Sequence, residues 1–265
     1  MSREKYQIPE KSIWLSLSVI DYDLHHYDEQ LKREINSTES ATWWLRCTSD
    51  IFVALKNLND ILSRATKLSG FRENSDLLAK TKLLHKRVDF VNHVRNRSSG
   101  HLDPIVTERA AQWAPEIFHE NANRETLVFL SYRALLEASI NSFLTPDGQQ
   151  KLFNHEIDLL YPPDRTEFFD FLGGVIKDSL DWIKHTLCFL DSVIIRHGST
   201  KVAELACIAG QTNFDLNSES DFSYDPQALK SAVEQAVSEF KQDGNDDIAE
   251  GLESLKNRLI KIDSN

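Results

Sequence analysis

Apolar residues recur at steps of three and four along most of the chain, and this spacing limits the fold more than any other feature of the sequence. The clearest example lies in residues 40–66, where the steps between successive apolar residues are 4, 4, 3, 4 and 3. Such spacing lines up side chains on one face of an α-helix, and no segment shows the alternation typical of strands. We therefore predict an all-α fold, an up-and-down helical bundle. The residues of this stripe are Cys47, Ile51, Leu55, Leu58, Leu62 and Ala65.

The same spacing predicts the remaining helices of the bundle. Ser12 is the expected N-cap of the first, because a serine side chain can bond the free amides of a first turn. Gly173 and Gly174 fall inside the last predicted helix, where each glycine costs about 1 kcal/mol relative to alanine. The pair is therefore expected to mark a close helix contact or a kink. The predicted ranges are 12–35, 75–94, 107–118, 124–144 and 164–196.

The composition changes after about His197. Residues 215–253 hold eleven acidic residues and two lysines, a net charge of −11 + 2 = −9. Two apolar stripes, over residues 229–240 and 248–262, predict a C-terminal helical hairpin. We therefore divide the chain into a helical bundle over residues 1–197 and an acidic C-terminal helical extension over residues 198–265. The hairpin is expected to pack on the chain's own bundle, with a partner or a second copy as the alternative.

The composition predicts a soluble cytoplasmic protein. Of the residues, 41% are hydrophobic and 27% are charged, and no apolar run approaches the roughly 20 residues of a membrane helix. The N-terminal segment lacks the apolar core of a signal peptide. Cys47, Cys188 and Cys207 are odd in number and far apart, which argues against a disulfide framework and a cysteine zinc site. They are expected to be small core residues in a reducing compartment, and no membrane contact is expected.

Residues 80–101 form a basic segment, called here the basic island, in an otherwise acidic chain. Six basic residues and the acid Asp89 give the island a net charge of +6 − 1 = +5. The whole chain carries −11, so the remainder carries −11 − 5 = −16. Such a segment favours a phosphate-bearing partner such as RNA, because repulsion elsewhere discourages unspecific binding. The residues expected to contact RNA are Lys86, Arg87, His93 and Arg97.

The island ends in Arg95-Asn96-Arg97-Ser98-Ser99-Gly100-His101, which combines the groups that RNA cleavage needs. Arginine offers phosphate oxygens a permanent, forked donor, and histidine exchanges a proton near neutral pH. A base can take the 2′-hydroxyl proton, the 2′-oxygen attacks the phosphorus, and the cation stabilises the developing charge. This chemistry needs neither metal nor cofactor, and none is predicted. Asp21 and His25 have a spacing that suits a metal ion but lack a third ligand.

Arg95-Asn96 followed after four residues by His101 resembles the Arg-x(4–6)-His signature of HEPN-domain proteins, helical-bundle ribonucleases of toxin–antitoxin and antiviral systems. The resemblance covers at most about residues 40–145. It implies metal-independent RNA cleavage by a homodimer whose two motifs face each other, with an antitoxin or regulatory protein as a further partner. It also implies that Arg95 stabilises the phosphate, Asn96 has a positioning role and His101 acts as acid and base. Family members usually carry a small apolar residue such as alanine where Gly100 stands.

Helix geometry leaves two arginines as partners for His101. At about 100° per residue, Arg95 and His101 lie about 120° apart around a continuous helix, and Arg97 and His101 lie about 40° apart. Arg97 is therefore the natural partner in a continuous helix. Arg95 can pair with His101 only if the helix ends or distorts at Ser98-Ser99-Gly100, or if a second subunit supplies one of the two side chains.

Two non-catalytic interpretations are also compatible with the sequence. The island can be a solvated helix face, with Arg95 paired to an acid on a neighbouring helix and His101 capping carbonyls at a helix end. The chain can also be a helical interaction module that binds a protein or nucleic-acid partner through the island or the acidic hairpin. Cleavage of RNA separates the catalytic interpretation from both.

Overall fold

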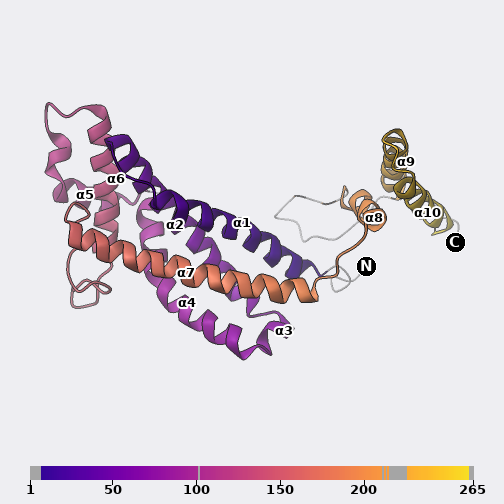
Figure 1. Cartoon of the computed structure of the whole chain (residues 1–265), viewed down its shortest axis with the longest axis horizontal. Coiled ribbons are helices and arrows are strands. Elements are labelled where there is room, and N and C mark those ends of the chain that lie inside the picture. The colour runs from indigo at the N-terminus through magenta and orange to yellow at the C-terminus, as the bar shows by residue number, and fades with distance from the viewer. Residues whose placement is uncertain (1–6, 101, 211, 213, 215–225, 263–265) are drawn as a thin grey trace. The chain divides into compact units, whose positions relative to one another are not determined.

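The structure, a computed structural model, describes residues 7–100, 102–210, 212, 214 and 226–262. Secondary structure in these ranges is helical, with one isolated bridge between Leu144 and Gln150 and no strand, so the predicted all-α fold is confirmed (Figure 1). The chain forms two compact units, Met1–Ile194 and Ile195–Asn265. The α-helices are α1 Ile8–Leu31, α2 Thr38–Ala65, α3 Ser69–Arg72, α4 Ser75–Val94, α5 Pro104–Trp113, α6 Arg124–Asn141, α7 Pro162–Val193, α8 Ser199–Ala209, α9 Pro226–Gln242 and α10 Asp246–Ile262.

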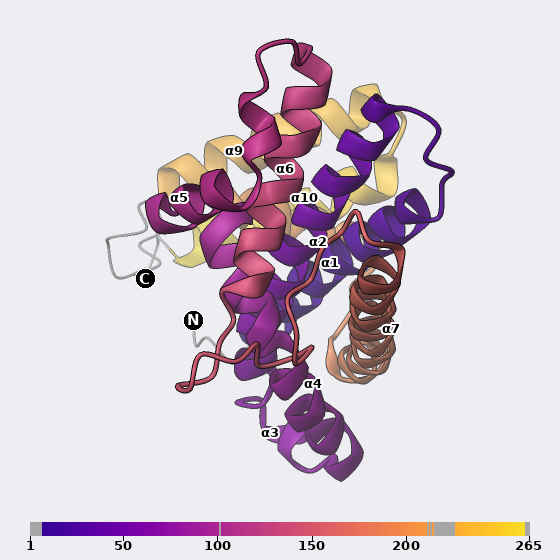
Figure 2. The same cartoon turned by 90° about the vertical axis from the view of Figure 1, so that its left-hand side faces the viewer.

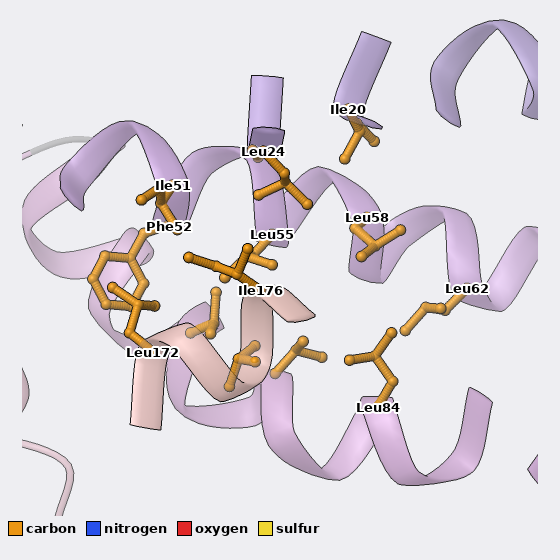
Figure 3. Close-up of a cluster of buried hydrophobic side chains, with 14 of the residues drawn as sticks. Ile20, Leu24, Ile51, Phe52, Leu55, Leu58, Leu62, Leu84, Leu172 and Ile176 are labelled. Atoms are coloured by element: carbon orange, nitrogen blue, oxygen red, sulfur yellow. The ribbon is translucent and has the colours of Figure 1, made fainter. Parts of the chain in front are cut away.

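The first unit is a bundle of α1, α2, α4 and α7, with α5 and α6 at one end (Figures 1 and 2). α2 is its central helix, because it packs against α1, α4, α6 and α7. Every residue of the stripe predicted between Cys47 and Ala65 is buried. The leucines and the isoleucine of the stripe share one apolar cluster with Leu24 of α1, Leu84 of α4 and Ile176 of α7 (Figure 3).

α1 begins at Ile8, so the prediction of Ser12 as its N-cap is wrong. Pro9 stands in the first turn, where its fixed φ is already helical and its missing amide costs nothing. α2, by contrast, is capped by Ser37, which forms a reciprocal capping box with Ser40. Oγ of Ser37 accepts the Ser40 amide at 3.1 Å, and Oγ of Ser40 accepts the Ser37 amide at 3.0 Å.

The single helix predicted over residues 107–118 is in fact two helices. Asp103 caps α5 by accepting the Ile105 amide at 2.9 Å, and Pro104 occupies the first turn. Pro115 separates α5 from a short 3₁₀ helix, η3 Pro115–Phe118, because proline has no amide to continue the helical bonds. α5 begins at Pro104, three residues after His101, the last residue of the motif.

α7 continues without a break through Gly173 and Gly174, and Gly174 alone of the two marks a close contact. A methyl group at Gly174 would lie 2.9 Å from Nη2 of Arg87, a residue of α4. The Arg87 guanidinium donates to the Gly174 carbonyl at 3.3 Å and also bonds Asp178. The close approach predicted for the glycine pair is thus found at Gly174, where an arginine side chain packs against the backbone of α7.

The second unit holds α8 and the predicted hairpin of α9 and α10. Leu229 and Val233 of α9 and Leu252 of α10 are buried and cluster with Cys207 of α8. The turn of the hairpin contains Gly244 at φ 73°, a left-handed conformation that glycine adopts without strain. The apolar stripes therefore bury against each other and against α8, an arrangement that the spacing alone did not predict.

Cys47 and Cys207 are buried, but Cys188 is exposed, so the prediction of three core cysteines is wrong for Cys188. All three carry free thiols. Among the helices that the structure describes, none combines the length and the apolar content that crossing a membrane requires.

Replacing Ser37 with alanine is expected to lower the free energy of unfolding by about 1 kcal/mol, because the capping box of α2 loses its hydroxyl. The control is Ser63→Ala, at an exposed position inside the same helix. Because Ser63 does not cap a helix end, its replacement should change the free energy of unfolding by less than about 0.5 kcal/mol. Urea unfolding followed by circular dichroism measures both, and equal losses would contradict the assignment of the cap.

Candidate functional site

α4 passes directly into a π-helical turn over Arg95–Ser99, called η2. The turn is closed by the Gly100 amide, which donates to the Arg95 carbonyl at 2.7 Å. A bond between residues five apart inserts an extra residue into a helix and shifts the faces that follow. The regular helix that would pair Arg97 with His101 therefore does not extend through the motif. His101 lies outside the described residues, so its pairing stays a prediction.

The Arg95 side chain folds along this turn onto Gly100. A methyl group at Gly100 would lie 2.7 Å from Cζ of Arg95 and 2.9 Å from its Nε and Nη1, so the guanidinium occupies the space of a side chain. Nη1 donates to Oδ1 of Asn96 at 3.2 Å. Within the described ranges, Arg95 forms no ion pair with a carboxylate. The interpretation in which Arg95 bridges to an acid on a neighbouring helix therefore finds no support there.

Three buried polar atoms without a hydrogen-bond partner lie along this stretch: Oδ1 of Asn92, Nε of Arg95 and Oγ of Ser99. Their steps of three and four place them on one face of the helix and turn. In the described chain, only Arg133 and Thr186 carry further side-chain atoms of this kind. Buried polar groups are almost always hydrogen-bonded, so this concentration marks an unsatisfied polar face beside the motif.

Arg97 is engaged with the residue that caps α5. Its Nη1 donates to Oδ2 of Asp103 at 2.7 Å, and its carbonyl accepts the Asp103 amide at 3.0 Å. The other carboxylate oxygen of Asp103 accepts the Ile105 amide. We call the two contacts between Arg97 and Asp103 the Arg97–Asp103 clasp. It links η2 to the N-cap of α5.

The residues expected to contact RNA do not gather on one surface. Arg87 faces α7, where it bonds Asp178 and lies 5.9 Å from the centre of the Phe171 ring. His93 faces α6, whereas Lys86 is exposed and forms no ion pair with a described residue. Much of the island's charge is neutralised by tertiary contacts, because half of its six cations pair with aspartates. These cations are Lys80, Arg87 and Arg97.

His93 is half-buried between α4 and α6. Its Nε2 lies 2.9 Å from Oγ of Ser142, and its ring centre lies 5.0 Å from that of Phe143. Because the Ser142 hydroxyl donates to the Ser139 carbonyl, the imidazole is the donor in its contact with Ser142. Burial lowers the pKa of His93, and the positive charge of Arg97 lowers it further. The ring is therefore neutral at pH 7 and serves the contact between the helices.

A buried ion pair on α6, not predicted from the sequence, supports this end of the bundle. Arg133 and Glu137 are 4% and 0% exposed, and Nη1 of Arg133 lies 3.2 Å from Oε2 of Glu137. Glu137 also accepts the Trp113 indole N–H and the Leu159 amide, each at 2.7 Å, and Arg133 pairs with Glu116. The network joins α5, η3, α6 and the segment before α7. Its only signal in the sequence is an arginine four residues before a glutamate in a largely apolar helix.

A cavity of about 340 Å³ opens directly after the motif. Leu102, the residue after His101, forms one wall, and α6 forms the rest. α5 and α6 pack on each other at this end of the unit (Figure 2). A second cavity, of about 280 Å³, lies where α1 and α2 meet and includes Trp43 and Trp44 in its lining. The α6 residues that line the first cavity are Arg124, Leu127, Val128, Ser131, Tyr132 and Leu135.

The part of the chain that the structure describes contains no group of three or more histidine, cysteine, aspartate or glutamate side chains that could hold a metal ion. The chain matches no protein-family model, no curated protein and no solved structure. The resemblance to HEPN-domain proteins is carried by the sequence motif, through Arg95, Asn96 and His101.

Acidic pH is expected to destabilise the protein through His93. The pKa of His93 in the folded state lies below the ordinary value of 6.5, so the unfolded state binds the proton more readily. The free energy of unfolding therefore falls as the pH drops through and below 6.5. His93→Gln keeps a polar group beside Ser142 and should flatten this slope, which urea unfolding at several pH values measures.

The exposed His26 of α1 provides the matched control for this pH dependence. His26→Gln should leave the slope of stability against pH as it is in the native protein. An unchanged slope in His93→Gln, or an equal flattening in the two variants, would exclude buried His93 as the origin of the pH dependence.

Proposed function

We propose that this protein is a metal-independent endoribonuclease of HEPN type, with a role in toxin–antitoxin or antiviral defence in the cytoplasm. The observation that supports it best is the position of Arg95. Its guanidinium covers Gly100, the residue directly before His101, and pairs with no carboxylate among the described residues. A guanidinium in this state can bind a phosphate without first breaking an ion pair. Arg97, by contrast, is held by Asp103.

In the proposed reaction, His101 accepts the proton of a 2′-hydroxyl, and the 2′-oxygen attacks the adjacent phosphorus. The bond from phosphorus to the 5′-oxygen breaks, and that oxygen takes up a proton, which leaves a 2′,3′-cyclic phosphate and a 5′-hydroxyl. Arg95 stabilises the negative charge that develops on the non-bridging oxygens. Asn96, whose Oδ1 accepts from Nη1 of Arg95, holds the guanidinium in position.

The contacts around the motif suit this chemistry. The Arg97–Asp103 clasp neutralises Arg97 and leaves Arg95 as the arginine of the motif that has no carboxylate partner among the described residues. The unpartnered atoms of Asn92 and Ser99 lie on the same helix face as Nε of Arg95. They can bond a water molecule beside Arg95.

On the basis of the resemblance, we also propose that the protein is a homodimer. In this dimer the motifs of the two copies, each with its Arg95 and His101, would face each other. The resemblance also adds an antitoxin or regulatory protein that blocks or controls the site. Residues 215–253, with their net charge of −11 + 2 = −9, would repel RNA and favour a basic segment of such a protein.

The alternative is a non-catalytic helical module that binds a protein or nucleic-acid partner. The ion pairs of Lys80, Arg87 and Arg97 favour it, because each reduces the positive charge that the island offers to phosphate. Such a module would bind RNA with a steep dependence on salt and would leave it intact. A cleavage assay therefore decides between the two functions.

Replacing His101 or Arg95 with alanine is expected to remove RNA cleavage and leave the fold intact. Loss of a general acid or base typically lowers the rate by about 10²–10⁴-fold, and loss of a group that stabilises developing charge by about 10²–10³-fold. The measurement is cleavage of single-stranded RNA in the presence of a metal chelator, resolved on a denaturing gel. Thermal unfolding of each variant checks that the fold persists.

The control for this experiment is His26→Ala, which removes an exposed histidine from α1. It should cleave RNA as the native protein does. Intact RNA with the native protein, or equal cleavage by the native protein and His101→Ala, would refute the catalytic function. Salt-dependent RNA binding without cleavage would support the interaction module instead.

Gly100→Ala is expected to lower cleavage by roughly tenfold to a hundredfold with little change in stability. The added methyl group would lie 2.7 Å from Cζ of Arg95, so the flexible arginine must leave its present position. Gly173→Ala is the matched control, because a methyl group there meets no atom within 4 Å. It should leave cleavage unchanged. Native activity in Gly100→Ala would show that the position of Arg95 over Gly100 is not required.

A further inference from the structure

The cavity between Leu102 and α6 follows the motif directly in the chain and has no task in the proposed reaction. Its lining is mostly apolar, with three groups of other kinds: the Tyr132 ring, the Ser131 hydroxyl and the Arg124 guanidinium. Tyr132 is 37% exposed and Leu102 is 60% exposed, so both side chains present apolar surface to solvent at the mouth of the cavity. An aromatic ring, a hydroxyl and a cation around an apolar floor form a suitable site for a flat polar ring.

Both walls of this cavity are held by contacts outside it. On one side, the Arg97–Asp103 clasp fixes the chain immediately after Leu102. On the other side, the buried pair of Arg133 and Glu137 ties α6 to α5 and to the segment before α7. These contacts position the backbone on both sides of the cavity, while the Leu102 and Tyr132 side chains are exposed.

We propose that this cavity binds one unpaired nucleobase of the RNA, next to the phosphate that is cut, an inference that rests on the proposed function. Its volume of about 340 Å³ lies at the lower end of the range for small-molecule sites, which suits a single ring system better than a helix of a partner protein. Unpaired RNA bases are recognised by stacking on aromatic side chains and by hydrogen bonds to their edges.

Each of the three non-aliphatic side chains in the lining can make a contact with such a nucleotide. The Tyr132 ring provides the stacking surface. The Ser131 hydroxyl donates to the Leu127 carbonyl at 2.7 Å, so its oxygen still offers a lone pair to an amino group of the base. Arg124 is exposed and forms no ion pair with any residue in the described ranges, so it is available to a neighbouring phosphate.

The test is binding of a short, single-stranded 2′-O-methyl RNA, which cannot be cleaved because its 2′-oxygens carry no proton. Fluorescence anisotropy compares the native protein with Tyr132→Ala, Tyr132→Phe and Tyr22→Ala, the last a control at an exposed tyrosine on α1. Tyr132→Ala is expected to bind roughly tenfold or more weakly, because a stacked base is lost. Tyr132→Phe and Tyr22→Ala should bind like the native protein.

A second variant covers the case in which Tyr132→Ala fails to fold. Val128→Glu places a negative charge in the cavity at an exposed position, and Val19→Glu places the same charge at an exposed position on α1. Only Val128→Glu should weaken RNA binding. An oligonucleotide with one abasic site, scanned along the sequence, should lose affinity at one position with the native protein and at none with Tyr132→Ala.

The outcomes separate the two proposals. If native RNA is cut and the cut depends on His101, but Tyr132→Ala and Val128→Glu bind RNA like the native protein, the base site is wrong and the ribonuclease stands. If the native protein neither binds nor cuts RNA, both proposals fail. If sedimentation shows that Tyr132→Ala changes self-association and not RNA affinity, the cavity belongs to a contact between copies, and the base site is overturned.

Discussion

Burial of α2 fixes the position of the elements that carry the candidate site. α2 packs against α1, α4, α6 and η2, so the motif turn and the helix that lines the cavity share one central neighbour. Each fully buried leucine of its stripe contributes roughly 1.5–3 kcal/mol, far more than one polar contact at the motif. Because protein interiors are close-packed, a shift of α2 would move η2 and α6 as well. Apolar packing therefore sets the geometry in which the polar residues act.

The parts of the fold that depend on local spacing could be predicted from the sequence, and the parts that depend on a single distant contact could not. The stripe from Cys47 to Ala65 is buried as predicted, because every residue on that face faces the same core. The start of α1 was wrongly placed at Ser12, because serine is a common N-cap residue. The helix in fact begins four residues earlier, with Pro9 in its first turn. The exposure of Cys188 depends on where α7 lies in the bundle, which spacing does not define.

The candidate site shows the same limit more clearly. A distortion near Ser98-Ser99-Gly100 was one of two conditions under which Arg95 could pair with His101, and η2 is a distortion of this kind, although it begins at Arg95. The clasp was not predicted, because Arg97 and Asp103 are six residues apart, beyond the three or four that a regular helix brings together. The summed charge likewise overestimated the positive charge that the basic island presents to a partner. A count of its cations does not include the two aspartates of α7 that pair with Lys80 and Arg87.

The two arginines of the motif have the same charge and lie two residues apart, yet the fold gives them different partners. Arg97 forms an ion pair with Asp103, so part of its charge is already neutralised within the protein. Arg95 is held only by Asn96 and by the space that Gly100 leaves open. An arginine that is positioned by shape and not by a carboxylate keeps its full charge for a partner. That difference is the physical reason why we propose Arg95, and not Arg97, as the residue that would bind the phosphate.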